Sequence, residues 1–452
     1  MMELKGKKVL VVGLGKSGLA AALFLRRCGA LVTVSDVRSA EALAKDIPAL
    51  LDEGIMVETG GHGLLTFRRQ DLIVVSPGVP LNTPELAQVK SFGLPVIGEL
   101  ELAARFLKGK ILAITGSNGK TTTTALVGEI LEKAGIPTLV GGNIGVPVVA
   151  LIDQSTDETW SVLEVSSFQL ESTERFHPSI AVILNITPDH LDRHGSFENY
   201  ALAKERIFAA QHEGDAVVLN ADNARAAQAA ARSVAKVYFF SMEHSVLQGA
   251  WVEDGWVVYR PGKDEPIEKI MPLSGITLKG AHNVENVLAA VCAARLAGVP
   301  SETIRKAVVE FRAVEHRLEF VREIRGVRYY NDSKATNVDA TVKAIEAFAG
   351  GIWLILGGKD KDSDYSVLAT LLRERVKTVI TIGSAAEKIE RQLAGVAKIV
   401  RAETMQRAVE LAHAQAGSGD TVLLAPACAS FDQFENYEHR GRVFKELVAN
   451  LK

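Results

Sequence analysis

The sequence predicts an α/β protein made of three domains in series. Short apolar segments rich in valine, isoleucine and leucine alternate with helical patterns, which is typical of parallel sheets covered by helices. This alternation restarts twice along the chain, and 452 residues are too many for one ordinary domain. We expect domains over residues 1–98, 99–313 and 314–452.

The first domain is expected to contain a buried parallel sheet. Its strands are predicted at Val9–Val12, Leu31–Val34 and Leu72–Val75, which are short runs rich in β-branched residues. A helix is predicted at Ser17–Cys28 and a helical connector at Glu99–Leu107. The repeat of strand, helix and strand predicts a Rossmann-like fold.

The second and third domains repeat this pattern. In the second, the strand Ile111–Thr115 leads through a glycine-rich loop into the helix Thr122–Ala134. We predict a second Rossmann-like unit for the C-terminal domain. Further strands are predicted at Ser161–Val165, Ala181–Leu184 and Ala216–Leu219, and in the third domain at Ile352–Leu356, Val376–Ile382 and Thr421–Leu424.

Composition and charge exclude several classes of protein. The formal net charge is −3 with no basic excess, so nucleic acid is not expected as a partner. The three cysteines, Cys28, Cys292 and Cys428, lie far apart, which argues against a disulfide framework or a cysteine zinc site. The sequence shows neither a secretion signal nor an apolar run that would span a membrane. We expect a cytoplasmic protein with a small-molecule partner.

The segment Gly13-Leu14-Gly15-Lys16-Ser17-Gly18 follows the first strand and opens the first helix. A G-x-G-x-x-G loop lets the backbone approach a pyrophosphate, which then lies at the helix N-terminus. Asp36 follows at the spacing of an acidic residue that binds a ribose hydroxyl. Taken alone, the loop fits NAD, a UDP-sugar or a tight turn that binds nothing.

The segment Gly116-Ser117-Asn118-Gly119-Lys120-Thr121 is the stronger signal for a nucleotide site. It joins a strand to a helix and also ends in a lysine and a threonine. Its backbone N–H groups suit an anion, Lys120 suits the β- and γ-phosphates, and the Thr121 hydroxyl suits Mg²⁺. Ile114 stands where the strict phosphate-loop pattern has its first glycine. We interpret the segment as a variant ATP loop and predict a P-loop ATPase-like central domain.

Several ionisable residues downstream are candidates for metal binding or catalysis. Glu164 lies in an apolar strand, where a carboxylate is costly unless it meets a cation. His190 belongs to a dense ionisable cluster that follows another strand, at the edge where doubly wound sheets bind ligands. Lys204 lies on the helix that follows and, taken alone, is most simply interpreted as a surface lysine.

A series of motifs in one order resembles the Mur ligases, a family of peptidoglycan precursor synthesis. The likeness covers essentially the whole chain and is strongest to the members that add D-glutamate to UDP-N-acetylmuramoyl-L-alanine. Besides the two glycine loops, the motifs are Ser76-Pro77-Gly78, Gly141–Gly145, Glu164–Glu171, Asn185–Arg193, Gly280–Asn286, His316-Arg317, Asn331–Asn337 and Pro426–Phe434.

The resemblance implies that the first glycine loop binds UDP rather than NAD, because the N-terminal domain of those members holds the sugar nucleotide. The residues implied for the UDP substrate are Gly15, Lys16, Ser17, Asp36, Val37, Arg38, Ser76, Asn143 and His190. Those implied for ATP are Gly116, Ser117, Asn118, Gly119, Lys120, Thr121, Thr122, Asn286, Arg317 and Asp332.

The resemblance further implies two Mg²⁺ ions and a lysine carbamate formed with CO₂. The implied ligands of the Mg²⁺ ions are Thr121, Glu164, His190 and carbamylated Lys204. A carbamate offers the oxygen ligands that Mg²⁺ prefers. The implied catalytic residues are Lys120, Glu164, His190, Lys204 and Lys334. The residues implied for D-glutamate are Thr336, Lys361, Ser430 and Tyr437.

The implied reaction is amide-bond synthesis through an acyl phosphate, with ADP and phosphate as products, and we expect a monomer. A sibling ligase that adds another amino acid is one alternative, although the Asp-Asn-Pro-Arg run expected of a meso-diaminopimelate adder is absent. Folylpolyglutamate synthase would not explain the first domain. An NAD-dependent dehydrogenase would leave the second glycine loop without a role. A non-catalytic regulator would not need Lys120, Glu164 and Lys204 together.

Overall fold

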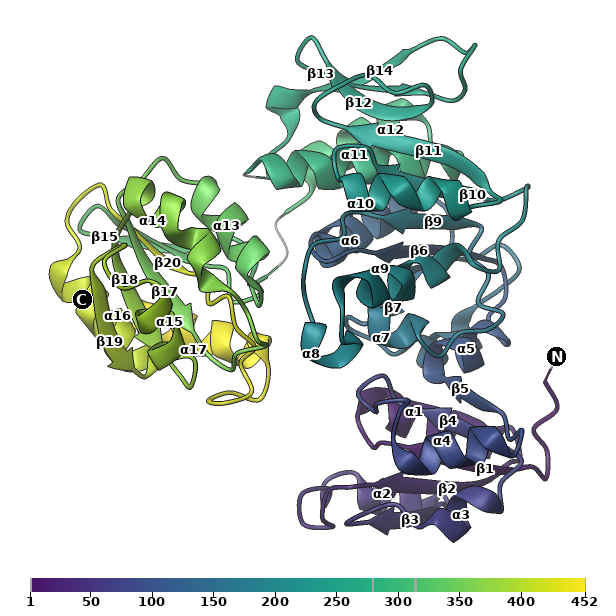
Figure 1. Ribbon diagram of the computed structural model, residues 1–452. Coiled ribbons are helices and arrows are strands. Elements are labelled where there is room, and N and C mark those ends of the chain that lie inside the picture. Colours follow the sequence, from purple (N-terminus) through teal and green to yellow (C-terminus); the bar gives the residue numbers. More distant parts are fainter. Residues whose placement is uncertain (1, 279, 313–314, 452) are drawn as a thin grey trace. The chain divides into compact units, whose positions relative to one another are not determined.

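The computed structural model describes residues 2–278, 280–312 and 315–451, whose strands form three separate sheets (Figure 1). The boundary predicted at residue 313 lies outside the described residues, and the boundary at residue 98 stays a prediction. The chain divides into two compact units. The first consists of Met1–Ile186, Glu198–Pro272 and Val287–Val308, and the second of Thr187–Phe197, Leu273–Asn286 and Val309–Lys452.

The first sheet is parallel, with the strand order β3-β2-β1-β4-β5. The order reverses between β1 and β4, which is the switch point where doubly wound sheets bind ligands. This confirms the predicted Rossmann-like fold. The elements are β1 (Lys8–Val12), α1 (Lys16–Arg27), β2 (Leu31–Asp36), α2 (Ile47–Asp52), β3 (Met56–Thr59), α3 (Leu64–Arg68), β4 (Leu72–Val75), α4 (Pro84–Ser91) and β5 (Val96–Gly98).

The second sheet has nine strands in the order β14-β13-β12-β11-β10-β9-β6-β8-β7. The strands from β7 to β12 are parallel, with β6 between β8 and β9, so their carboxyl ends share one edge. These strands are β6 (Lys110–Thr115), β7 (Thr138–Gly142), β8 (Trp160–Glu164), β9 (Ile180–Ile183), β10 (Ala216–Asn220), β11 (Lys236–Ser241) and β12 (Gly249–Glu253). The antiparallel extension by β13 (Trp256–Arg260) and β14 (Glu268–Pro272) was not among the sequence predictions.

The main helices of this region are α5 (Glu99–Ala104), α6 (Lys120–Lys133), α7 (Ser167–Leu170), α9 (Phe197–Glu205), α11 (Ala281–Leu296) and α12 (Ser301–Glu310). Across the residues that the structure describes, no helix is both long and apolar enough to cross a membrane.

The third sheet has the order β15-β16-β20-β17-β18-β19 and is parallel except for the edge strand β15. Alternate residues of β17 enter different apolar cores, Leu354 and Leu356 on one face and Trp353 and Ile355 on the other. Helices therefore cover both faces of the sheet, as Figure 1 shows. The strands are β15 (Glu319–Ile324), β16 (Val327–Asn331), β17 (Ile352–Gly357), β18 (Val376–Ile382), β19 (Ile399–Glu403) and β20 (Thr421–Leu424), and the helices are α13 (Val338–Glu346), α14 (Ala369–Arg375), α15 (Ala386–Gln392), α16 (Met405–Gln415) and α17 (Tyr437–Ala449).

A buried carboxylate anchors α5 to the segment that precedes β9. Glu101 is fully buried, and its Oε2 accepts hydrogen bonds from the backbone N–H groups of residues 174–176 at 2.8, 2.9 and 3.0 Å. Its Oε1 accepts a hydrogen bond from Arg105 at 2.8 Å. Because these N–H groups have this carboxylate as a common acceptor, losing it would leave three donors without this partner, including the buried Phe176 N–H.

We therefore predict that Glu101→Ala lowers the free energy of unfolding by about 3–5 kcal/mol in urea titrations. Glu174→Ala is the matched control, because the Glu174 side chain is exposed and its ion pair with Arg105 contributes under about 1 kcal/mol. Equal effects of the two substitutions would contradict the anchoring role of Glu101.

Candidate active site

The first glycine loop lies at the carboxyl end of β1, beside the end of β4. Gly13 has a φ of 89°, and a Cβ on Gly18 would lie 1.9 Å from the Gly13 carbonyl oxygen, so both positions require glycine. A Cβ on Gly15 would meet nothing within 4 Å, which leaves its backbone open to a ligand. The Ser76 hydroxyl donates to the Gly13 carbonyl at 2.7 Å and holds the loop from β4. Lys16 and Ser17 begin α1, so the loop presents a helix N-terminus suited to a diphosphate.

Asp36 is held by the chain itself rather than left open to a ribose. Its Oδ2 accepts from the Leu14 N–H at 2.7 Å and from Arg38 at 2.8 Å, and its Oδ1 accepts from Arg38 as well. Burial opposes ionisation, but these hydrogen bonds outweigh it and lower the pKa of Asp36 to about 2. The half-exposed Arg38 therefore covers the carboxylate that NAD would need, while Val37 beside it is exposed.

The second glycine loop continues β6 into α6 and lies at the centre of its sheet. Gly119 has a left-handed φ of 85° as it caps α6, and a Cβ on Gly116 would come within 3.0 Å of Leu184. The side-chain oxygen of Asn185, directly after β9, accepts from the Asn118 N–H at 2.8 Å. The Asn185 side chain, from the segment after the neighbouring strand β9, thus holds the loop in position.

Two residues predicted to bind ATP, metal or substrate, Thr121 and Asn143, converge on the carboxylate of a third, Glu164. Glu164 ends β8 and is 1% exposed. Its Oε2 accepts from the Thr121 hydroxyl at 2.7 Å, and its Oε1 accepts from the Asn143 amide at 2.9 Å. Within the described part of the chain, Glu164 forms no ion pair with lysine or arginine. A buried carboxylate with only neutral partners is suited to a hard divalent cation beside the Thr121 hydroxyl.

Two lysine side chains converge on the Gly116 carbonyl. Lys120 Nζ donates to this oxygen at 2.9 Å and to the Ser117 carbonyl at 2.9 Å. Lys204 Nζ donates to the same Gly116 oxygen at 2.8 Å and lies 4.5 Å from the centre of the Tyr200 ring. Lys204 is 1% exposed, so its interpretation as a surface lysine, from the sequence taken alone, is wrong. Two ammonium groups at one carbonyl form a local positive centre suited to phosphate.

Sequence reasoning gave no role to Tyr200 or to the side chain of Asn185. The Tyr200 hydroxyl lies 3.1 Å from the Ser117 hydroxyl, so α9 contacts the loop through two residues one helical turn apart, Tyr200 and Lys204. The four-residue spacing of Tyr200 and Lys204 in the sequence could have indicated that both lie on one face of a helix. Asn185 follows β9 directly, much as Glu164 ends β8, and its position at the shared edge was a second signal.

In the second unit, Asp189 connects His190 to a residue predicted to bind D-glutamate. His190 is the N-cap of α8 (Leu191–His194), with a left-handed φ of 53°, and its Nε2 lies 3.6 Å from Asp189 Oδ2. Asp189 Oδ1 accepts from Lys361 at 3.4 Å, and its Oδ2 accepts from the Asn337 amide at 2.9 Å. Lys361 is thus oriented by the Asp189 carboxylate, and its contact with D-glutamate stays a prediction.

Of the residues predicted to bind the adenine nucleotide, Asn286 and Asp332 are buried and Arg317 is partly buried. Within the described residues, Arg317 Nε is buried without a hydrogen-bond partner, which suits an additional polar ligand. Burial raises the pKa of Asp332 to about 6, and Arg317 limits that rise. The Asn286 amide donates to Asn283 at 3.0 Å. Desolvation, followed by the charge of Arg317, lowers the pKa of the adjacent His282 to about 3.

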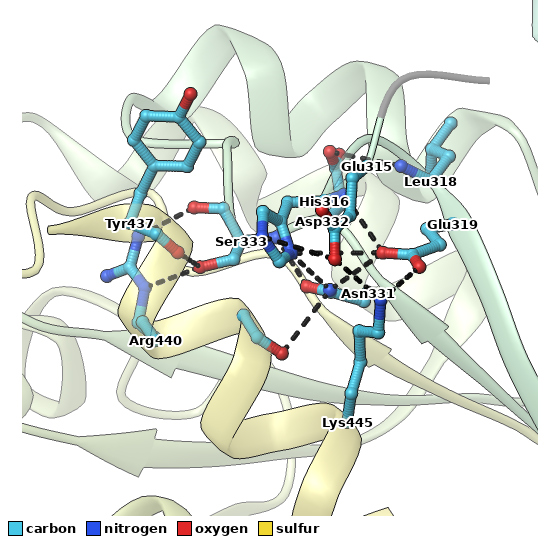
Figure 2. A network of polar contacts seen from close by, with 11 residues as sticks. Glu315, His316, Leu318, Glu319, Asn331, Asp332, Ser333, Tyr437, Arg440 and Lys445 are labelled. Carbon is cyan, nitrogen blue, oxygen red and sulfur yellow. Dashed lines mark hydrogen bonds and ion pairs between the residues drawn. The ribbon is translucent and has the colours of Figure 1, made fainter. Parts of the chain in front are cut away.

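A polar network surrounds Asn331, Asp332 and Ser333 (Figure 2). Asn331, the last residue of β16, lies 2.9 Å from the His316 ring nitrogen and donates to Glu319 at 3.1 Å. From α17, Arg440 donates to the Ser333 hydroxyl at 3.0 Å and to its carbonyl at 2.7 Å. Desolvation lowers the pKa of this buried guanidinium to about 10. The network fixes the start of the loop in which Lys334 and Thr336 lie.

The remaining predicted residues lie around this loop or after β20. Lys334 Nζ donates to the Tyr437 hydroxyl at 3.1 Å and lies 4.7 Å from the centre of its ring. Ser430 is 2% exposed in the segment that follows β20. The Thr336 N–H donates to the Lys334 carbonyl at 2.8 Å. The second unit therefore brings together Lys334, Tyr437 and Thr336, whereas their ligand contacts stay predictions.

Three family models match the chain in order. They are the Mur ligase MurD-like N-terminal domain over residues 7–98, the Mur ligase middle domain over 114–294, and the Mur ligase glutamate ligase domain over 316–428. A curated relative from Acidobacterium capsulatum is 72% identical, with 99% of this chain and 97% of the relative covered. The chain belongs to the Mur ligase family.

That relative is named UDP-N-acetylmuramoylalanine--D-glutamate ligase, as is a Koribacter versatilis protein that is 61% identical over 100% of this chain and 99% of its own. Among solved structures, the Mur ligase UDP-N-acetylmuramate-alanine ligase MurC from Thermotoga maritima aligns with a TM-score of 0.61 at 20% identity. It covers 99% of this chain and 100% of its own. This structural likeness supports the three-domain α/β fold.

The raised pKa of Asp332 gives a pH prediction. Between pH 4 and 6 the unfolded chain ionises this carboxyl while the folded chain keeps it protonated, so stability falls as pH rises. Asparagine does not titrate. The unfolding free energy of the wild type minus that of Asp332→Asn should therefore fall by about 2 kcal/mol from pH 4 to pH 7. The exposed Asp157→Asn is the control, and a pH-independent difference for Asp332→Asn would contradict the assignment.

Proposed function

We propose that this chain is an ATP-dependent ligase that joins D-glutamate to UDP-N-acetylmuramoyl-L-alanine and releases ADP and phosphate. The observation that carries the proposal is the convergence of Lys120, Lys204, Thr121 and Glu164 at one sheet edge. The 72% identical relative named for this reaction supports the choice of substrates. Because ATP is the phosphoryl donor, the proposal places the reaction in the cytoplasm, and we propose a monomer.

The residues at the second glycine loop suit ATP with Mg²⁺. Thr121 and Glu164 would hold one ion, since an unpaired buried carboxylate and a hydroxyl provide hard oxygen ligands. When bound, Mg²⁺ would offset negative charge on the phosphates. Lys120 would lie along the β- and γ-phosphates, where its charge stabilises the transferring phosphoryl group. Arg317 and Asp332 supply polar groups for the nucleoside.

In the first step, an oxygen of the alanine carboxylate attacks the γ-phosphorus of ATP. The bond from phosphorus to the β–γ bridging oxygen breaks, ADP leaves with that electron pair, and an acyl phosphate forms. Two anions must approach each other, so the positive charge of Lys120, whose Nζ lies at the Gly116 carbonyl, favours the reaction. The UDP of this substrate would lie on Gly15–Ser17, where the helix N-terminus and Arg38 favour a diphosphate.

We further propose that Lys204 acts as a carbamate. Its neutral amine would attack CO₂, form a nitrogen–carbon bond and release one proton. The product would carry a negative charge and two oxygens in place of a buried ammonium, and those oxygens suit Mg²⁺, while the metal role of His190 stays a prediction. Burial supports this proposal, because Lys204 is 1% exposed and its Nζ donates to the same Gly116 carbonyl as Lys120, so a neutral amine that can react with CO₂ is favoured over two neighbouring buried cations.

In the second step, the neutral amine of D-glutamate attacks the acyl carbon. A tetrahedral intermediate forms, phosphate leaves with the bonding electrons, and the amine loses a proton. Lys361, Thr336, Ser430 and Tyr437 would orient D-glutamate, with Lys361 positioned by Asp189 toward a carboxylate. Lys334 would stabilise charge on the phosphoryl group.

We predict that phosphate release from ATP, with UDP-N-acetylmuramoyl-L-alanine and Mg²⁺ present, requires D-glutamate. L-glutamate, L-lysine and meso-diaminopimelate should each support a rate at least about 100-fold lower, because a site with fixed polar partners discriminates strongly. Reactions without the UDP substrate are the control. Release with another amino acid but not D-glutamate would favour a sibling ligase, and NAD-dependent turnover without ATP would favour the dehydrogenase.

A further inference from the structure

Two histidines and an aspartate lie together at the edge of the central sheet opposite the ATP loop. His177 precedes β9, and His212 and Asp215 precede β10. Since β9 and β10 are adjacent parallel strands, with Ala216 opposite Ile180, the segments before them meet at the amino-terminal edge. The ATP loop follows the carboxyl end of β6 in the same sheet, so a strand length of roughly 15 Å separates the two edges. The reaction proposed above uses none of the three residues.

The possible metal-binding atoms of these three residues lie close to one another. Asp215 Oδ2 lies 2.7 Å from His177 Nε2 and 3.1 Å from His212 Nδ1, and the three donor atoms all lie within 4.8 Å of one another. Donors of a tetrahedral zinc ion, each about 2.0–2.2 Å from the metal, lie about 3.4 Å apart. The separations within the cluster, which lie between 2.7 and 4.8 Å, bracket this spacing.

The backbone around the cluster holds the donors in place. The His212 N–H donates to Asp215 Oδ2 at 2.8 Å, and the Asp215 N–H donates to the His212 carbonyl at 3.0 Å, which closes a tight turn. The buried Gln211 amide donates to the carbonyls of Pro178 and Ala216 at 2.9 and 3.0 Å. Gln211 therefore ties the segment that carries His177 to the segment that carries the other two donors.

The charge balance of the cluster also suits a cation. The Asp215 side chain is only 6% exposed, and within the described residues no lysine or arginine pairs with it. Its ionisable partners are the two imidazoles, whose ring centres lie 4.7 Å apart. Two imidazolium ions at this distance would repel each other, whereas a single divalent ion would satisfy the carboxylate and both neutral rings.

We propose that His177, His212 and Asp215 form a binding site for a divalent transition metal, with Zn²⁺ as the preferred ion. Two imidazoles and one carboxylate favour Zn²⁺ over Mg²⁺, which prefers an all-oxygen shell. The exposed side of the cluster, where the His212 side chain is 69% exposed, leaves room for a water ligand. A bound ion would join the segments before β9 and β10 and act as a clamp on the central sheet.

The test is calorimetric titration of metal-free, full-length protein with Zn²⁺ in excess Mg²⁺, which occupies oxygen-rich sites. We expect one Zn²⁺ per chain at this site, and at least about tenfold weaker binding in His177→Ala and in His212→Ala. Both side chains are partly exposed, so these variants should fold. Retained phosphate release with D-glutamate would verify folding, because neither residue belongs to the proposed reaction.

Two control variants make the assignment specific. Glu213→Gln removes a charge from the same turn without removing a donor, and His244→Ala removes the histidine of a separate cluster with Asp222 and Glu243. Both should bind Zn²⁺ like the wild type. The proposal is overturned if the wild type binds no stoichiometric Zn²⁺, if His177→Ala binds it with unchanged affinity, or if His244→Ala alone abolishes binding.

Discussion

The chemistry of the first unit depends on the Gly116 carbonyl, which accepts hydrogen bonds from both Lys120 and Lys204. One lysine comes from the helix that follows the loop and the other from α9, so a single backbone oxygen gathers two cations that lie far apart in sequence. In the proposed reaction Lys120 offers its positive charge to phosphate, whereas Lys204, as a carbamate, would offer oxygen ligands to Mg²⁺. The two lysines at this carbonyl would therefore serve different parts of the same reaction.

The parallel sheet makes this gathering possible. Gly116 follows β6, Glu164 ends β8 and Asn185 follows β9, and these three strands are neighbours. Their carboxyl ends bring a loop, a carboxylate and an amide to one edge of the sheet. The Asn185 side chain accepts from the loop at Asn118, and Glu164 accepts from the loop at Thr121. The third sheet, in the second unit, likewise carries predicted site residues at the carboxyl end of a strand. Asn331 ends β16, and hydrogen bonds around Ser333 and Arg440 support the loop that contains Lys334.

Much of this could be predicted from the sequence because it is local. Strand patterns placed β18 and β20 correctly. The glycine spacing predicted the second glycine loop between a strand and a helix. Glu164 stood out as a charge in an apolar strand. By contrast, the buried state of Lys204 and the hydrogen bonds that occupy Asp36 depend on packing between distant segments, which no local pattern records. Of the two antiparallel strands that were missed, β14 buries only two of its five residues and gives a weak apolar signal, whereas the apolar run in β13 was a signal that the sequence reasoning overlooked.

The most direct test of this account replaces Lys204 and measures phosphate release in the presence of D-glutamate. Lys204→Arg keeps a cation that can reach Gly116 but cannot form a carbamate, so its rate should fall by at least about 100-fold. Lys204→Ala should fall as far, and added acetate or formate should restore part of its activity by supplying the missing carboxylate. The exposed-helix variant Lys133→Ala should behave like the wild type. Near-normal activity of Lys204→Arg, with no rescue of Lys204→Ala, would contradict the account.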